Sequence, residues 1–330
     1  MNKIKIFSLI FTTLISTNSL AVVLKISTTY PSGTYIVKTL KAASKEIEAQ
    51  TEGRVKLKFY PGGVQGDNKT VLKKIKRGIL AGALIEIGAM SAYFNDAQVY
   101  NAPMIFNDFD EVDFVRSRMD AQIILGFATK GWKIFGFIDG GFAYAMTNKR
   151  VVDMEELKQQ KLWLPASDPL SEKVASALGL SPIYLGLGEV LTSLQTGAIN
   201  AIVAPATATL ILQWHSKLKY VVDVPFMYTY AALSLSDKAF KKLSDSDQAL
   251  ISDILGKTLA TIDKNSRTDN LKAFKALETQ GLNILKPNQA EINSLKSSAQ
   301  EATKRLVEQG QFSQNILNQL NQLLTEFRAN

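Results

Sequence analysis

The reactive side chains of this 330-residue sequence indicate binding rather than catalysis. A Ser-His-Asp triad needs a positioned imidazole, and a zinc site commonly needs several His or Cys ligands. The chain has no cysteine, and its one histidine, His215, stands beside Trp214, as is typical of a packed or surface residue. The segment GGVQG at 62–66 lacks the spacing of a phosphate-binding loop. We therefore expect no catalytic residue, no metal and no cofactor.

The first candidate for ligand contact is Trp163, in KQQKLWLPASDP at residues 158–169. Leu162 and Leu164 flank it, which predicts a short buried strand that ends at Pro165. A large indole at such a strand end either fills the core or forms the wall of a binding site, and the residues alone leave both roles open. An exposed indole face would suit an apolar, aromatic or cationic ligand.

Glu86 is the second candidate, because it ends the apolar run ALIE at 83–86. An unpaired carboxylate in an apolar core is costly, so we expect this side chain to face a cleft. Ligands of open α/β sheets bind beyond the carboxyl ends of the strands. Glu86, Trp163 and Pro205, each at or near the end of a predicted strand, should therefore surround one cleft.

Strand and helix patterns alternate along the first part of the chain. VVLKIST at 22–28 and RVKLKFY at 54–60 predict strands, and ALIEIGAM at 83–90 predicts a buried strand. Between them, apolar residues three and four apart predict helices over 36–47 and 68–77. This alternation predicts an α/β fold built on a layered sheet.

A helix–glycine–strand unit occurs twice in the sequence. The apolar positions and the glycine of 71–80 recur at 190–199, 119 residues later. Gly78 and Gly197 are placed to end the two helices, a position that favours glycine. An apolar strand follows each, ALIEIGA in the first case and INAIVAP in the second. The repeat predicts two lobes built alike, with a ligand cleft between them.

The first 21 residues have the features of a signal peptide. Lys3 and Lys5 precede an apolar run at 6–15, and SLA at 19–21 offers a cleavage site. No later run reaches the roughly 18 uninterrupted apolar residues of a membrane helix. We therefore expect export to the periplasm, with anchoring by a retained leader as the alternative.

The positive charge of the chain is moderate and spread out. Removing the leader removes two lysines and lowers the formal charge from +8 to +6. The densest basic run, KKIKR at 73–77, falls on a predicted helix. A solvated helix face explains it better than a surface for nucleic acid or anionic lipid, so we expect no nucleic-acid partner.

The mature chain is long enough for two lobes, each with its own core. We assign residues 22–145 and 236–275 to lobe I, and residues 146–235 and 276–330 to lobe II. Long helical patterns at 246–280 and 312–327 are expected to brace the lobes. A dimer contact through these helices is the alternative to the monomer that we expect.

Six ordered segments resemble the DctP-type solute-binding proteins of TRAP (tripartite ATP-independent periplasmic) transporters. They are TEGRVKLKFYPGGVQGD, VLKKIKRGIL, YNAPMIF, ELKQQKLWLP, LGEVLTSLQTGAINAIVAP and LKYVVDVP, and the resemblance runs from Lys25 to Leu259. It implies a two-lobed periplasmic-binding-protein fold with a central ligand cleft. Such a receptor closes on a small-molecule solute and delivers it to the membrane subunits of a sodium-driven carrier.

The resemblance also identifies departures in the expected cleft. In typical members the strand that matches KLWLP reads KIRVP, and its arginine binds the solute carboxylate; that position is Trp163 here. A second common arginine falls on Ala143 and a common asparagine on Ala204. LQWHSKLKYVVDVP, at 212–225, likewise fits a subgroup with tryptophan in its central motif. Without these donors, an ordinary organic acid should bind poorly unless a lysine or backbone N–H groups compensate.

The strand-end rule and the resemblance together predict the substrate-binding residues. They are Trp163, Glu86, Tyr30, Asp67, Tyr184, Leu187, Gln213 and Trp214. Two other functions stay open. The same receptor could signal to a membrane histidine kinase instead of a carrier, or the chain could be a secreted hydrolase that depends on carboxylates such as Glu86.

Overall fold

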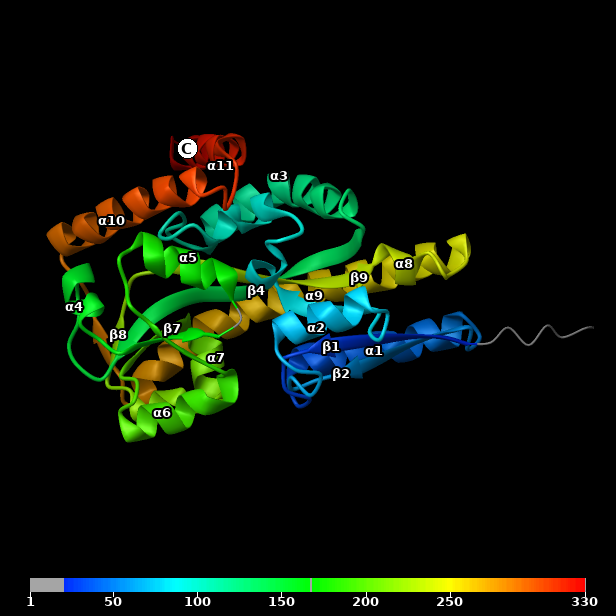
Figure 1. The fold of residues 1–330 in the computed structure, drawn as a ribbon, viewed down its shortest axis with the longest axis horizontal. Coiled ribbons are helices and arrows are strands. Elements are labelled where there is room, and N and C mark those ends of the chain that lie inside the picture. Colours follow the sequence, from blue (N-terminus) through cyan, green and yellow to red (C-terminus); the bar gives the residue numbers. More distant parts are fainter. Residues whose placement is uncertain (1–20, 167, 330) are drawn as a thin grey trace, which may run out of the picture.

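A computed structural model describes residues 21–166 and 168–329. Apart from Ala21, the predicted signal peptide lies outside these residues. Within them, ten strands form one mixed sheet (Figure 1). The order is β2 (Val55–Tyr60), β1 (Val22–Thr28), β3 (Gly82–Glu86), β9 (Met227–Ser236), β4 (Trp132–Thr147), β7 (Ala201–Pro205), β5 (Leu162–Pro165), β6 (Ile183–Leu185), with β8 (Tyr220–Val222) beside β4 and β10 (Asn283–Leu285) beside β8.

Helices pack on both faces of this sheet, so the predicted α/β class is confirmed. The α-helices are α1 (Tyr35–Gln50), α2 (Asn68–Lys76), α3 (Phe109–Ala128), α4 (Met154–Lys158), α5 (Pro169–Ala177), α6 (Val190–Thr196), α7 (Ala206–Ile211), α8 (Asp237–Phe240), α9 (Asp245–Thr279), α10 (Gln289–Glu308) and α11 (Gln314–Ala329). Short 3-10 helices are η1 (Ile87–Met90), η2 (Asn95–Asn101), η3 (Leu187–Glu189) and η4 (Trp214–Lys217).

The two longest strands, β4 and β9, form the antiparallel middle of the sheet. On one side β3 pairs antiparallel with β9, and β1 and β2 follow in parallel. On the other side β7 pairs antiparallel with β4, and β5 and β6 follow in parallel. We call the half with β1–β3, α1, α2 and η1 the first lobe, and the half with β5–β7, α5 and α6 the second lobe.

The strand register makes the carboxyl ends of the two half-sheets point at each other. Glu86, the last residue of β3, lies beside Ala231 of β9, and Ala231 pairs with Ile138 of β4. At the end of β7, Pro205 lies beside Ala143 of β4. Five residue steps of β4 therefore separate the two strand ends, roughly 16 Å at the usual rise per residue. This short stretch of β4 separates the two strand ends around which the sequence predicts a cleft.

The repeat seen in the sequence is confirmed as a structural repeat. In the first lobe α2 ends before Gly78, whose φ is 75°, and the chain enters β3. In the second lobe α6 ends at Gly197, whose φ is 72°, and the chain enters β7. β3 and β7 occupy matching places on either side of the β9–β4 pair. Both glycines adopt the left-handed conformation that ends a helix.

Three apolar clusters hold these layers together. One packs α1 and the first half of α9 against β1 and β2, and includes Leu40, Leu57 and Leu255. A second packs α6 and η4 against β5 and β7 in the second lobe. The third is continuous along the opposite face, where α3, α10 and α11 cover both halves. The lobes thus have separate cores on one face and a common core on the other.

The middle of β4 is fixed to α9 through buried polar contacts. The Asp139 carboxylate, on a residue 2 % exposed, accepts hydrogen bonds from Arg267 Nε (3.0 Å) and Asn270 Nδ2 (3.3 Å) of α9, and from the backbone N–H of Gly141. The β4–β9 register is irregular between Asp139 and Gly141. Gly141 has a φ of 89°, and a Cβ there would lie 2.5 Å from the Asn270 side chain. Only glycine fits this position.

The C-terminal region has the long helices that the sequence predicts. α9 is 35 residues long and runs behind both halves of the sheet in Figure 1. α10 packs on α5 and α4, and α11 packs on α3. The predicted lobe boundaries at 145, 236 and 275 fall within β4, β9 and α9, respectively. Because these elements are shared by both halves, the exact division of the chain stays a prediction, as does the monomeric state.

Candidate ligand-binding site

Three polar side chains converge where strands of the two lobes end. Tyr30 follows β1, Glu86 is the last residue of β3, and Asp168 lies between β5 and α5. Tyr30 Oη donates a hydrogen bond to Glu86 Oε1 at 3.4 Å. The Asp168 carboxylate is close enough to Glu86 to raise its pKa by repulsion. Two carboxyl groups and a phenol, all partly buried, therefore meet from both lobes.

The local sequence explains why Asp168 is held there. Its carboxylate caps the N-terminus of α5, accepting hydrogen bonds from Leu170 N–H (3.1 Å) and Ser171 Oγ (2.5 Å), and Pro169 occupies the first turn. Gly88 of η1 is so close that a Cβ would lie 2.8 Å from Asp168 Oδ1. The two lobes thus touch at this point. Asp168 was missing from the predicted site, although an Asp-Pro step before an amphipathic helix is a recognisable N-cap signal.

The environment of Glu86 changes its titration. Burial raises the pKa of this carboxyl to about 7, repulsion from Asp168 acts in the same direction, and the hydrogen bond from Tyr30 opposes both. Burial also raises the pKa of Asp168, against the hydrogen bonds from Ser171 and Leu170. Glu86 can therefore change charge near neutral pH, which is a common property of ligand-binding positions.

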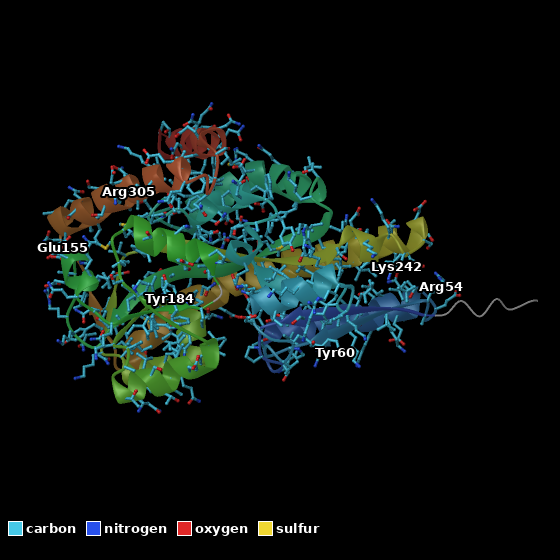
Figure 2. The ribbon with its side chains drawn as sticks, in the orientation of Figure 1. Arg54, Tyr60, Glu155, Tyr184, Lys242 and Arg305 are labelled. Atoms are coloured by element: carbon cyan, nitrogen blue, oxygen red, sulfur yellow. The ribbon has the colours of Figure 1, made fainter. Side chains whose placement is uncertain are left out.

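A pocket of about 400 Å³ lies between the lobes; Asp168 lines it, whereas Glu86 and Tyr30 are not among its lining residues. From the first lobe it is lined by Lys69, Leu72, Lys73, Lys76, Ala89, Ala92 and Tyr93, and from the second lobe by Pro165, Ala166, Asp168, Pro169, Glu172 and Tyr184. Figure 2 shows Tyr184 on the second lobe, far from Arg54 and Lys242 at the other end of the molecule. The volume is in the range of small-molecule sites. None of the lining residues is an arginine.

Trp163 and Trp214 pack against each other in the core of the second lobe. Their exposed fractions are 3 % and 2 %, and their rings meet edge to face with centroids 5.0 Å apart. Trp163 Nε1 donates a hydrogen bond to the Leu185 carbonyl at 3.1 Å. Apolar residues of β7 and α6 complete the cluster. This geometry supports the packing role that the sequence left open, because the indole has no free face in this conformation.

The other predicted site residues are dispersed. Asp67 is exposed and caps α2 by accepting a hydrogen bond from Thr70 N–H at 2.8 Å. Gln213 is exposed in a turn with a φ of 60°. Leu187 is 45 % exposed and is not among the residues that line the pocket. Of the eight predicted residues, Tyr30 and Glu86 lie together and Tyr184 lines the pocket; their contact with a solute stays a prediction.

The positions that match the second common arginine and the common asparagine of the family are buried. Ala143 is 1 % exposed on β4 and Ala204 is 4 % exposed on β7.

In residues 21–166 and 168–329, no group of three or more His, Asp or Glu side chains is arranged to hold a metal ion. Over the same part of the chain, no helix is both long and apolar enough to cross a membrane.

The match to a family model agrees with this architecture. Residues 26–310 match the DctP model, described as bacterial extracellular solute-binding protein, family 7. The chain belongs to this family. Its members bind small-molecule solutes and work with the membrane subunits of TRAP transporters.

The relatives are solute-binding proteins rather than enzymes. The sialic acid-binding periplasmic protein SiaP of Vibrio cholerae is 23% identical over 294 residues, which cover 87% of this chain and 90% of SiaP. The ectoine-binding periplasmic protein TeaA of Halomonas elongata is 22% identical over 80% of this chain and 79% of its own. A TRAP periplasmic solute-binding protein of Haemophilus influenzae, solved with L-gulonate, has a TM-score of 0.82 at 18% identity and covers 91% of this chain and 99% of its own. The predicted two-lobed fold is confirmed.

Replacing Trp163 should test its packing role. Trp163→Ala removes a fully packed indole and should lower the free energy of unfolding by about 3–5 kcal/mol. Trp163→Phe keeps most of the contact area but loses the hydrogen bond to Leu185, at a cost of about 1 kcal/mol. Urea unfolding measures both values. Leu187→Ala, at a half-exposed position, is the control and should change stability by less than about 0.5 kcal/mol. An alanine variant as stable as the wild type would contradict the packing role.

The raised pKa of Glu86 should make stability depend on pH. Between the ordinary carboxyl pKa of about 4.5 and the folded value of about 7, the folded chain holds a proton that the unfolded chain has lost, so stability falls as pH rises. Glu86→Gln removes this contribution. The variant should match the wild type at pH 4 and be more stable by about 3 kcal/mol at pH 8, measured by urea unfolding. Equal differences at both pH values would show that Glu86 titrates normally.

Proposed function

We propose that this chain is the solute receptor of a TRAP transporter. It captures a small polar solute in the pocket between its lobes and delivers it to the membrane subunits. Membership of the family supports the transport role, and the periplasmic relatives together with the leader-like first 21 residues support export. The solute is held without covalent chemistry, and no cofactor or metal takes part.

The observation that carries this proposal is the meeting of polar groups from both lobes. Tyr30 and Glu86 come from the first lobe and Asp168 from the second. Asp168 lines the pocket; Glu86 and Tyr30 are not among its lining residues, but Glu86 lies near Asp168 and accepts a hydrogen bond from Tyr30. Ligands of α/β sheets bind at such ends. A solute placed here would contact both lobes at once, as a receptor that closes on its ligand requires.

The carboxyl groups at the strand ends favour hydrogen-bond donors on the solute. Trp163 and Ala143 stand where relatives of the resembled type carry arginines, and both are buried. Glu86 and Asp168 instead present acceptor oxygens that suit a hydroxyl or ammonium group. Because the indole of Trp163 is packed against Trp214, we assign recognition to these oxygens and not to stacking on the indole.

Closure would bend the molecule where the lobes share elements. β4, β9 and α9 connect the halves, and the irregular stretch of β4 at Asp139–Gly141 lies between the two strand ends. A solute that binds the closed arrangement more tightly than the open one shifts the population toward closure. The same movement would serve a receptor for a membrane kinase, so sensing stays an alternative that the neighbouring genes would distinguish.

A metabolite screen by thermal shift, followed by calorimetry on the best compound, tests this function. Binding should raise the unfolding temperature. Glu86→Gln and Tyr30→Phe should each weaken binding at least tenfold, about 1.4 kcal/mol. Glu278→Gln, at an exposed site on α9, is the matched control and should leave affinity unchanged. Unaltered affinity in both site variants would place the solute elsewhere, and turnover of the compound would favour the hydrolase instead.

A further inference from the structure

The two walls of the interlobe pocket carry opposite charges. Among the residues that line the pocket, the charged side chains of the first lobe are all lysines and both carboxylates come from the second lobe; Glu86 of the first lobe is not a lining residue. The lysines are Lys69, Lys73 and Lys76 of α2, and the carboxylates are Asp168 and Glu172 at the start of α5. The charge is therefore divided by lobe and is not mixed around the rim.

Helix geometry explains why three lysines face the pocket together. Lys69, Lys73 and Lys76 are four and three residues apart, so they share one face of α2. The intervening Lys74 turns away and donates hydrogen bonds to the backbone and side-chain oxygens of Gln65, at 2.8 and 3.0 Å. The pocket-facing lysines form no salt bridge among the described residues.

The two carboxylates on the opposite wall, Asp168 and Glu172, likewise form no salt bridge among the described residues. Asp168 is bound to Ser171 and to the N-terminus of α5, and Glu172 follows one turn later on the exposed surface of that helix. No salt bridge joins α2 to α5 within the described part of the chain, and the pocket of about 400 Å³ lies between them. When the lobes close, charges on both walls lose water, and each needs a partner of opposite sign to offset that loss.

We infer that the solute is a zwitterion, whose anionic group meets the lysines of α2 and whose cationic group meets the carboxylates at the start of α5. This inference rests on the proposed receptor function and specifies its substrate class. It also explains how a pocket without arginine binds an acid group, because α2 supplies the positive charge from the opposite wall. The positive and negative groups of the solute should lie at its opposite ends, because the lysines and the carboxylates lie on opposite walls of the pocket.

The rest of the pocket suits a compact hydrocarbon or ring between those charges. Leu72, Ala89 and Ala92 line it from the first lobe and Pro165 from the second. Tyr93 and Tyr184 also line it, and aromatic faces contact alkyl groups and cations favourably. Apolar contact in the middle and charge at both ends define a small amphipathic zwitterion.

A zwitterion would also couple binding to closure. A solute with one charge engages one wall only and leaves the other wall unpaired when water is removed. A solute with both charges bridges α2 and α5 and so stabilises the closed arrangement specifically. We therefore expect the receptor to bind a zwitterion more tightly than a solute that carries only the positive or only the negative charge.

Matched compounds test this inference. Calorimetry on the full mature chain would compare trios in which one molecule is a zwitterion and the others lack one charge, such as 5-aminopentanoate, pentanoate and pentylamine, within a library of metabolites sorted by charge. The tightest ligand should be a zwitterion, bound at least tenfold more tightly than its acid or amine counterpart. Raising the salt concentration should weaken its binding.

Variants on each wall give the second measurement. Lys73→Gln and Glu172→Gln should each weaken the best zwitterion about tenfold, whereas Lys45→Gln on α1 and Glu278→Gln on α9 should not. A best ligand that is a simple acid, with affinity unaffected by Glu172→Gln, would overturn the inference and leave the receptor function intact. A complete absence of small-molecule binding would overturn both.

Discussion

The structure depends on one constraint, the antiparallel pairing of β4 with β9 in the middle of a continuous sheet. Because β3 and β7 pair with opposite members of this pair, their directions are opposed and their carboxyl ends face each other. Only a short stretch of β4 lies between Glu86 and Pro205. The pairing alone therefore makes this the expected place for a binding site, because ligands of α/β sheets bind at the carboxyl ends of strands.

The same pairing determines where the polar side chains for a ligand lie and where the two lobes are connected. Side chains at or just after the ends of β1, β3 and β5 bring Tyr30, Glu86 and Asp168 together from two lobes. Tyr30 is also close enough to Asp139, in the irregular stretch of β4, for that carboxylate to raise its pKa. On α9, Arg267 and Asn270 hold Asp139 at the same point. Polar groups for a ligand and the shared elements that would bend during closure are therefore adjacent, so a ligand there can influence the relative position of the lobes.

The sequence predicted the repeated fold better than the details of the site. Strand ends could be located because apolar runs stop at Glu86 and Pro205, and the glycines at 78 and 197 marked matching helix ends. The position of Trp163 was also predictable, but its environment was not, since contact with Trp214 depends on how η4 folds back onto β5. Asp168 was missed because its role as a helix cap concealed that it also faces Glu86. The division of charge across the pocket could not be predicted, because it depends on α2 and α5 lying on opposite sides of the pocket, and no local sequence pattern specifies that arrangement.

The distance between the lobes in solution tests the central claim most directly. Because the chain contains no cysteine, spin labels can be attached at Cys residues introduced for Lys41 on α1 and Gln195 on α6, both exposed and outside the pocket. Pulsed electron spin resonance should give a shorter interlobe distance when a ligand confirmed by calorimetry is added to saturation, and an unchanged distance with a non-binding analogue. The same distance with and without saturating ligand would contradict capture by closure at the facing strand ends.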